Sequence, residues 1–214
     1  MIAGRLLVPI LALGSYLATL PLAGAHRLDE YLQATRLSIN LDRIDVEMDL
    51  TAGQAAASQV FSWIDTNRDG EISQAEGEAY ARQVLGSVTL LADGKPVPLA
   101  LTEALFPELR EMSQGTGIIR LRVAGRMPTV GAGRHEVSFR NNHRPESSVY
   151  LVNALVPANP RIKIADQQRD HAQHGLLMSY TVTSEAPPLR SFALIAGLAL
   201  AGRWYLRRQR KRVV

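Results

Sequence analysis

Hydrophobic and polar residues alternate over several short stretches of the chain. In the clearest of these, Ile44, Val46, Met48 and Leu50 interleave with Arg43, Asp45, Glu47 and Asp49. Successive side chains of a strand point to opposite faces, so this pattern predicts strands with one buried face. The same alternation covers residues 36–41, 119–123, 136–140 and 176–183. Asn40–Arg43 joins the first two stretches closely enough to predict a hairpin.

One stretch is apolar almost throughout and therefore predicts a different position in a sheet. Residues 148–156 (SVYLVNALV) favour a central strand, since a strand covered on both faces loses its polar positions. Turn residues at Asp93-Gly94, Gly115–Gly117 and Pro157–Pro160 separate the predicted strands. Many short strands with such turns indicate a mainly β, sandwich-like domain.

Residues 52–86 break the β pattern and predict two helices inserted into this domain. Thr51 is a candidate N-cap, and the alanines at 55–57 favour a first helix with Val60, Phe61 and Ile64 on its apolar face. Residues 74–85 favour a second helix, which Gly86 would end.

Between these helices lies the segment with the most specific chemistry. Residues 65–76 follow the pattern D-x-N-x-D-G-x-I-S-x-x-E. Ca²⁺ is a hard cation that takes six to eight oxygen ligands, and alternating Asp and Asn side chains can supply them from a wrapping backbone. Gly70 permits the sharp turn that such a loop needs.

This segment resembles the calcium loop of the EF-hand family. The resemblance implies a metal site in which each position has its own role. Asp65, Asn67 and Asp69 would contribute side-chain oxygens, and Glu71 its backbone carbonyl. Ser73 would act directly or through water, and Glu76 would bind with both carboxylate oxygens. We expect weak, structural or stabilising Ca²⁺ binding, in the range of about 10⁻⁴–10⁻³ M found for extracellular modules.

The sequence departs from the family in having one such loop where the family has pairs. Ile72 occupies the position that the family places against a neighbouring loop, and Asp93-Gly94 lacks upstream ligands. Ile72 is therefore expected either to pack on the β-domain or to meet a second copy of the chain in a homodimer. Sensor-like opening is not implied for an unpaired loop.

The two ends of the chain carry targeting signals. Residues 1–25 have a positive Arg5, an apolar run and the small residues Ala23-Gly24-Ala25, which together predict a signal peptide. An uncleaved anchor is the alternative. Residues 188–206 are predicted to form one transmembrane helix, with Trp204 at the interface, and residues 207–214 a basic cytoplasmic tail. The chain would then be a single-pass membrane protein whose main domain, residues 26–187, lies in the periplasm, outside the cytoplasm.

Composition supports this division and excludes several classes of protein. The chain of 214 residues has a net charge of +4, but residues 26–187 hold 16 basic residues against all 20 acidic ones. The cations are therefore concentrated at the C-terminus, and no nucleic-acid surface is predicted. The absence of cysteine from the sequence excludes disulfides and zinc–thiolate centres. No hydrolase or nucleotide-binding signature is present, and we expect a protein that is not an enzyme.

A second hypothesis concerns transition metals. Cleavage after Ala25 would leave His26 at the N-terminus, where its amine and imidazole can chelate copper or nickel. His171 and His174 would share a face only on a helix, and a strand or turn is expected there. Residues 26–37, 150–157 and 170–182 resemble extracytoplasmic domains of bacterial proteins related to hydrogenase and urease accessory metal permeases. The alternative function is therefore an accessory domain for copper or nickel handling with His26 as a ligand, and transport by this chain alone is not implied, since it lacks the multi-span part. For the calcium-binding module, the expected partner is an unidentified envelope protein.

Overall fold

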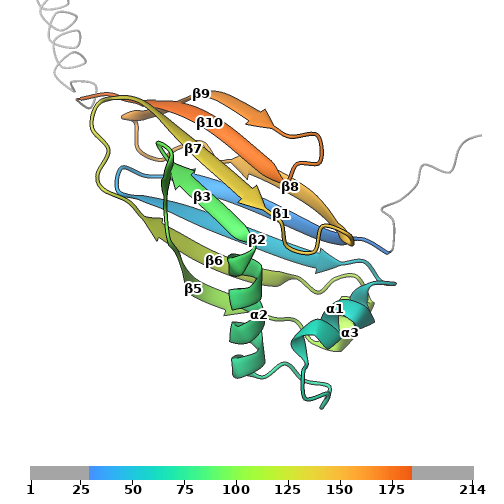
Figure 1. The fold of residues 1–214 in the computed structure, drawn as a ribbon. Coiled ribbons are helices and arrows are strands. Elements are labelled where there is room, and N and C mark those ends of the chain that lie inside the picture. Colours follow the sequence, from blue (N-terminus) through green and yellow to red (C-terminus); the bar gives the residue numbers. More distant parts are fainter. Residues whose placement is uncertain (1–28, 185–214) are drawn as a thin grey trace, which may run out of the picture.

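The computed structural model describes residues 29–184, which form two packed β-sheets with helices at one end (Figure 1). The first sheet has the strand order β5-β6-β2-β1-β8 and the second the order β4-β3-β7-β10-β9. In chain order the elements are β1 (Tyr31–Ile39), β2 (Arg43–Ala52), α1 (Ala57–Ile64), α2 (Gln74–Gly86), β3 (Val88–Ala92), β4 (Lys95–Pro96), β5 (Leu99–Leu105), α3 (Leu109–Ser113), β6 (Ile119–Arg126), β7 (Gly133–Asn141), β8 (Ser148–Ala154), β9 (Ile162–Arg169) and β10 (Gly175–Val182).

The alternating stretches form the central strands of this sandwich. The even-numbered residues of β2 from Ile44 to Ala52 are buried, and the odd-numbered ones are partly exposed. β1 pairs antiparallel with β2 through the hairpin, where the Asn40 N–H donates to the Arg43 carbonyl at 2.9 Å. The predicted mainly β, sandwich-like class is confirmed. Residues 1–28 and 185–214, with the predicted signal peptide and membrane segment, lie outside the described residues.

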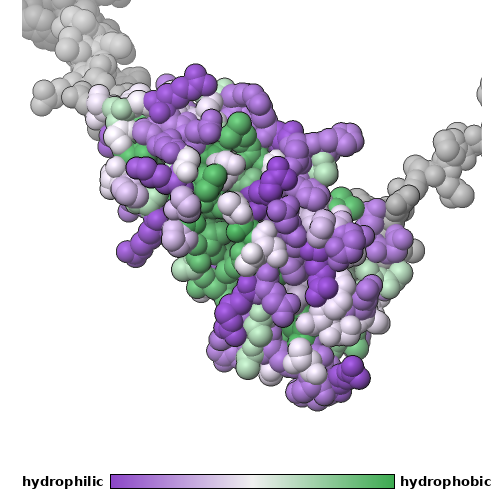
Figure 2. All heavy atoms as spheres, viewed as in Figure 1, coloured by the Kyte–Doolittle hydropathy of each residue, from purple (hydrophilic) through white to green (hydrophobic). Residues whose placement is uncertain are grey.

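The core lies between the two sheets and continues under the helices. Leu37, Met48 and Leu121 of the first sheet and Phe139 and Met178 of the second are at most 1% exposed. Val60 and Ile64 of α1 and Tyr80 and Val84 of α2 join the same cluster. Figure 2 shows apolar side chains at the surface between β3 and β5. The half-buried Leu99 and Leu101 of β5 pack against the core.

Two predictions about particular elements are wrong. Thr51 does not cap α1, because it lies within β2, and Ala56 precedes the helix without a side-chain cap. Residues 148–154 form an edge strand instead of a central one, since β8 pairs parallel with β1 at the border of the first sheet. Its apolar outward side chains, Val149 and Leu151, are 37% and 38% exposed.

None of the helices among residues 29–184 is long and apolar enough to cross a membrane. α2 is the longest of the three, with 13 residues, and it packs beside β5. A Cβ at Gly77 would come within 2.7 Å of the Phe106 ring, so only glycine lets this ring lie directly on the helix. This contact fixes α2, and with it the end of the loop that precedes it.

Candidate metal centre

The acidic loop, which we define as residues 65–76, is held between α1 and α2. Asp65 follows the last residue of α1, and its N–H donates to the Phe61 carbonyl at 2.9 Å. Ser73 is the N-cap of α2, and its hydroxyl accepts from the Glu76 N–H at 3.4 Å. The Glu76 side chain in turn accepts from the Ser73 N–H at 3.1 Å, which completes a capping box. Both ends of the loop are thereby fixed by helix termini.

The carboxylate of Asp65 organises the first half of the loop. Its Oδ1 accepts hydrogen bonds from the Arg68 N–H at 2.6 Å and the Asp69 N–H at 3.2 Å, and its Oδ2 accepts from the Gly70 N–H at 3.0 Å. The backbone can turn toward this carboxylate because Gly70 adopts a φ of +86°. Asp65 is 6% exposed, so its charge is held inside the turn by amide dipoles.

The next two predicted ligand positions lie on the outer side of the loop. The Asn67 Oδ1 accepts from the Asp69 N–H at 2.9 Å, and the Asp69 Oδ1 accepts from the Glu71 N–H at 2.9 Å. The Asn67 amide also donates to the Asp69 Oδ2 at 2.8 Å. Asn67, Asp69 and Glu71 are exposed, so their oxygens are accessible from solvent.

The carboxylate of Glu76 joins the two ends of the loop. Its Oε1 accepts from the Thr66 N–H at 2.8 Å and the Asn67 N–H at 3.2 Å, and its Oε2 accepts from the Ser73 hydroxyl at 2.7 Å. Hydrogen bonds from the Ser73 side chain, and then from the backbone of Ser73 and Asn67, lower the pKa of Glu76 to about 2. This carboxylate is therefore ionised at neutral pH.

The six predicted ligand residues thus occupy one compact loop, but they are not gathered around a common centre. Among residues 29–184, no three or more His, Asp or Glu side chains are grouped closely enough to hold a metal ion. Glu76 is directed at the amides of Thr66 and Asn67, whereas Asp69 faces the solvent side. The donor set has the hard oxygen chemistry that Ca²⁺ requires, in an arrangement stabilised by backbone N–H groups.

Ile72 packs on its own domain in this structure. It is half-buried and contacts the hydrophobic core cluster. A hollow of about 540 Å³ adjoins it and is lined also by Phe61, Phe106 and Leu109. Ile72 therefore packs on the core within one chain, while the predicted homodimer stays a prediction.

A buried polar cluster, which no local sequence pattern predicts, connects α2 to the sandwich. The Tyr80 hydroxyl lies 2.9 Å from the Tyr31 hydroxyl of β1 and 3.1 Å from the His143 Nε2. All three residues are at most 4% exposed. Burial, and secondarily the charge of Arg144, lower the pKa of His143 to about 4, so the imidazole is neutral.

The segment that carries His143 contacts both helices that flank the acidic loop. Arg144 lies over the Trp63 ring of α1 at 4.0 Å from its centroid, while His143 contacts Tyr80 of α2. The His143 carbonyl accepts from Gln33 at 2.8 Å and from Tyr150 at 2.7 Å. Residues 143–144 therefore tie the helix pair to β1 and β8.

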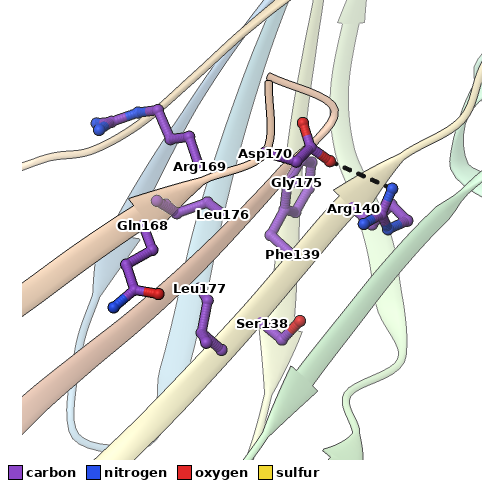
Figure 3. Close-up of a pocket in the computed structure, with 9 residues that line it drawn as sticks. All are labelled: Ser138, Phe139, Arg140, Gln168, Arg169, Asp170, Gly175, Leu176 and Leu177. Atoms are coloured by element: carbon purple, nitrogen blue, oxygen red, sulfur yellow. Dashed lines mark ion pairs between the residues drawn. The ribbon is translucent and has the colours of Figure 1, made fainter. Parts of the chain in front are cut away.

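The other histidines show no metal site among the described residues. His26 lies outside them, and His171 and His174 lie in the turn between β9 and β10, as expected. The His174 ring stacks on Tyr150 with centroids 4.1 Å apart. Beside this turn, a hollow of about 240 Å³ is spanned by the Arg140–Asp170 ion pair at 3.3 Å, while Arg169 points away from it (Figure 3).

Comparison with protein families and curated proteins finds no relative of this chain. No protein-family model matches the chain, and no curated protein sequence matches it significantly. The chemistry of the acidic loop and its position in the fold therefore carry the functional argument.

Proposed function

We propose that this chain is a membrane-anchored, extracytoplasmic module that binds one Ca²⁺ in the acidic loop. Asp65, Asn67, Asp69, Glu71, Ser73 and Glu76 would hold the ion, as their resemblance to an EF-hand loop implies. The ion neutralises charge and orders the loop, and it takes no part in a chemical reaction. The observation that carries the proposal is an oxygen-rich loop held between two helix ends, with its terminal glutamate ionised.

The charge of the loop supports a divalent cation as the ligand. Asp65, Asp69, Glu71 and Glu76 bring four negative charges into twelve residues, against the single positive charge of Arg68. Like charges at such spacing repel one another, and a bound cation removes that repulsion. The chain lacks cysteine, and the loop offers only oxygen ligands, which favours Ca²⁺ over softer transition metals.

The hydrogen bonds of the loop support weak binding. Glu76 is engaged by the Thr66, Asn67 and Ser73 amides, and these bonds must be exchanged for contacts with the ion. The cost of that exchange lowers the affinity, which agrees with the expected range of about 10⁻⁴–10⁻³ M. Such a site is filled where calcium is abundant outside the cytoplasm.

The contacts of α2 support a stabilising role for the ion. Tyr80 follows Glu76 by four residues, so the two side chains lie on one face of the helix. Glu76 closes the loop, and Tyr80 reaches His143 and Tyr31 in the sandwich. An ion that fixes Glu76 would therefore also fix the helix end that is anchored in the buried cluster.

The site is tested by the melting temperature of the full chain with and without calcium. At about 10 mM Ca²⁺ and a Kd of about 10⁻³ M, we expect Tm to rise by about 3–6 °C. Glu76→Gln removes one charge of the loop and should abolish this rise. Glu78→Gln is the matched control, since Glu78 is partly exposed on the same helix and pairs with Arg82. An equal calcium-dependent rise in both variants refutes the site.

The biological role that fits this module is that of an accessory domain for another envelope protein. The resemblance of residues 26–37, 150–157 and 170–182 to domains of metal permease-related proteins supports this role. Recovery of a specific membrane protein with the full chain, in a calcium-dependent manner, is the expected result. Transition-metal chelation by His26 concerns a residue outside the described structure.

A further inference from the structure

The two ends of the sandwich differ, and the chain leaves from the end opposite the acidic loop. In Figure 1 the loop and helices lie at one end, while the end of β10 lies at the other. The segment between β8 and β9 lies beside this point of exit, because the Thr183 N–H donates to the Arg161 carbonyl at 2.9 Å. The Arg161 Nε donates back to the Thr183 carbonyl at 2.8 Å.

An apolar tip, which we define as residues 155–160, projects beside this exit. Its sequence is LVPANP, without a charged residue. Val156 is 89% exposed and Leu155 38%, although they follow a strand whose Val152 is 1% exposed. The Leu155 N–H donates to the Leu37 carbonyl at 2.8 Å, so the base of the tip is fixed to β1. The tip therefore presents valine and leucine to water from a fixed position, where both are available for an apolar contact outside the domain.

Exposed cations share this end of the sandwich with the tip, and the acids there include Asp42 of the hairpin and Asp93, which pairs with His135. Arg134 and Lys163 both lie opposite Thr181 of β10, one on each neighbouring strand, and both are exposed. In the other sheet Arg43 lies opposite Arg126 at the same end. Like charges across neighbouring strands disfavour each other in the isolated domain. Arg43 is balanced in part by Asp45 at 3.1 Å, whereas Arg126, Arg134 and Lys163 have no ion pair within the described residues.

The length of chain beyond β10 determines what can cover this end. Seven residues lead from Ser184 to Ser191, where the uncharged C-terminal stretch begins. Even fully extended, they span at most about 25 Å. If that stretch spans the membrane, as the proposed function holds, the end with the apolar tip faces the bilayer at close range. Apolar side chains flanked by cations fit the interface of a membrane that contains anionic lipids.

We propose that the exit end of the sandwich is a membrane-docking surface, with Val156 and Leu155 in the lipid interface and Arg126, Arg134 and Lys163 at the lipid phosphates. The acidic loop is then held away from the membrane by the length of the sandwich. β2 alone has ten residues, which corresponds to about 33 Å. This inference rests on the proposed anchoring, and it adds a fixed orientation of the domain relative to the membrane.

The test uses single thiols, since the sequence contains no cysteine. Val156→Cys and Val149→Cys in the full chain are labelled with an environment-sensitive fluorophore and placed in vesicles with about one-third anionic lipid and a nitroxide in the headgroup region. Val149 is the matched control, because it is exposed on the preceding strand, seven residues or about 23 Å away. We expect the label at position 156 to be quenched at least about twofold more strongly than the label at 149.

Two further measurements distinguish the contribution of the cations to docking from the anchoring of the chain in the vesicle. Arg134→Glu combined with Lys163→Glu should weaken docking, since each cation near an anionic surface contributes about fivefold to association. Flotation of the chain with the vesicles reports anchoring independently. Flotation with equal quenching at 156 and 149 refutes the docking surface and leaves the anchor intact. Protection of position 156 in native membranes but not in lipid vesicles assigns the surface to a protein and refutes lipid docking. Failure to float refutes both.

Discussion

The two ends of the sandwich place a histidine in opposite surroundings. At the end with the acidic loop, His143 is 4% exposed, and burial lowers its pKa to about 4. At the exit end, the His135 Nδ1 lies 2.8 Å from the Asp93 Oδ2, and this hydrogen bond raises the pKa of His135. The first histidine belongs to a packed cluster that has to stay neutral. The second is a surface partner for a carboxylate.

The same contrast extends to the other residues of each end. Tyr31, Tyr80 and His143 satisfy each other's hydrogen bonds inside the protein and fix α2. The exit end has an exposed valine and exposed cations instead, and its loops are joined by backbone hydrogen bonds such as that between Val130 and Leu41, at 2.8 Å. One end is ordered by internal side-chain hydrogen bonds, and the other is the end that we propose contacts the membrane.

The largest effect that we predict is a loss of stability in acid that comes from His143. Its folded pKa, about 4, lies below the unfolded value of 6.5, so the stabilising contribution is complete above pH 6.5. It is lost as the pH falls from 6.5 toward 4, and amounts to at most about 3 kcal/mol. Urea unfolding between pH 7 and 4 measures this slope, which His143→Gln should flatten.

His135 provides the control for this prediction because its sign is opposite. Its folded pKa is raised, so its contribution is complete below pH 6.5 and is lost as the pH rises through the folded value. His135→Gln should therefore keep the acid slope of the wild type. An imidazole resonance of His143 that titrates near pH 6.5 would contradict the burial argument, whatever the stability of the variants.

The next effect concerns the hydroxyl of Tyr80. Tyr80→Phe leaves the His143 Nε2 and the Tyr31 hydroxyl without this buried partner, and we expect a loss of about 2 kcal/mol in the free energy of unfolding. Tyr180→Phe is the matched control at the other end. Tyr180 is also 1% exposed, and it contacts His135 by its ring, at 5.5 Å between centroids. Its replacement should cost less than about 0.5 kcal/mol. Equal losses would show that the cluster adds nothing specific.

The smallest effect is predicted for the apolar tip. Val156→Ala should change the free energy of unfolding by less than about 0.5 kcal/mol, because the side chain is 89% exposed. Val152→Ala, four residues earlier and 1% exposed, should cost about 1.5 kcal/mol. Denaturant unfolding of both variants in parallel measures the difference. A comparable loss at Val156 would mean that the tip serves folding instead of an external contact.

The residues show why part of the fold was predictable from the sequence. Strands with one buried and one solvent-exposed face, such as β2 and β6, can be predicted because their hydrophobic and polar residues alternate. The apolar run of β8 was misleading, because it predicted a central strand. The strand lies at a sheet edge instead, with Val149 and Leu151 exposed. β5 and β9 escaped prediction because they are edge strands with irregular burial and a shift in register.

The candidate site divides in the same way. The acidic loop, residues 65–76, could be predicted because all of its ligand candidates lie within twelve consecutive residues. The cluster of Tyr31, Tyr80 and His143 joins residues that are 49 and 63 positions apart, and no local pattern marks such a meeting. Thr51 resembled a helix cap, but pairing with Leu32 keeps it in β2. Long-range pairing overrides local preference at that position.

Two glycines provide the most direct test of the calcium site. Gly70 of the acidic loop and Gly94 at the exit end both turn the chain with a positive φ, of +86° and +74°. In an amide NMR titration of the intact chain, the Gly70 resonance should move with saturation in the range of about 10⁻⁴–10⁻³ M Ca²⁺. The Gly94 resonance should stay in place. An unmoved Gly70 at about 10 mM Ca²⁺, or equal and unsaturated shifts of both glycines, would contradict calcium binding by the acidic loop.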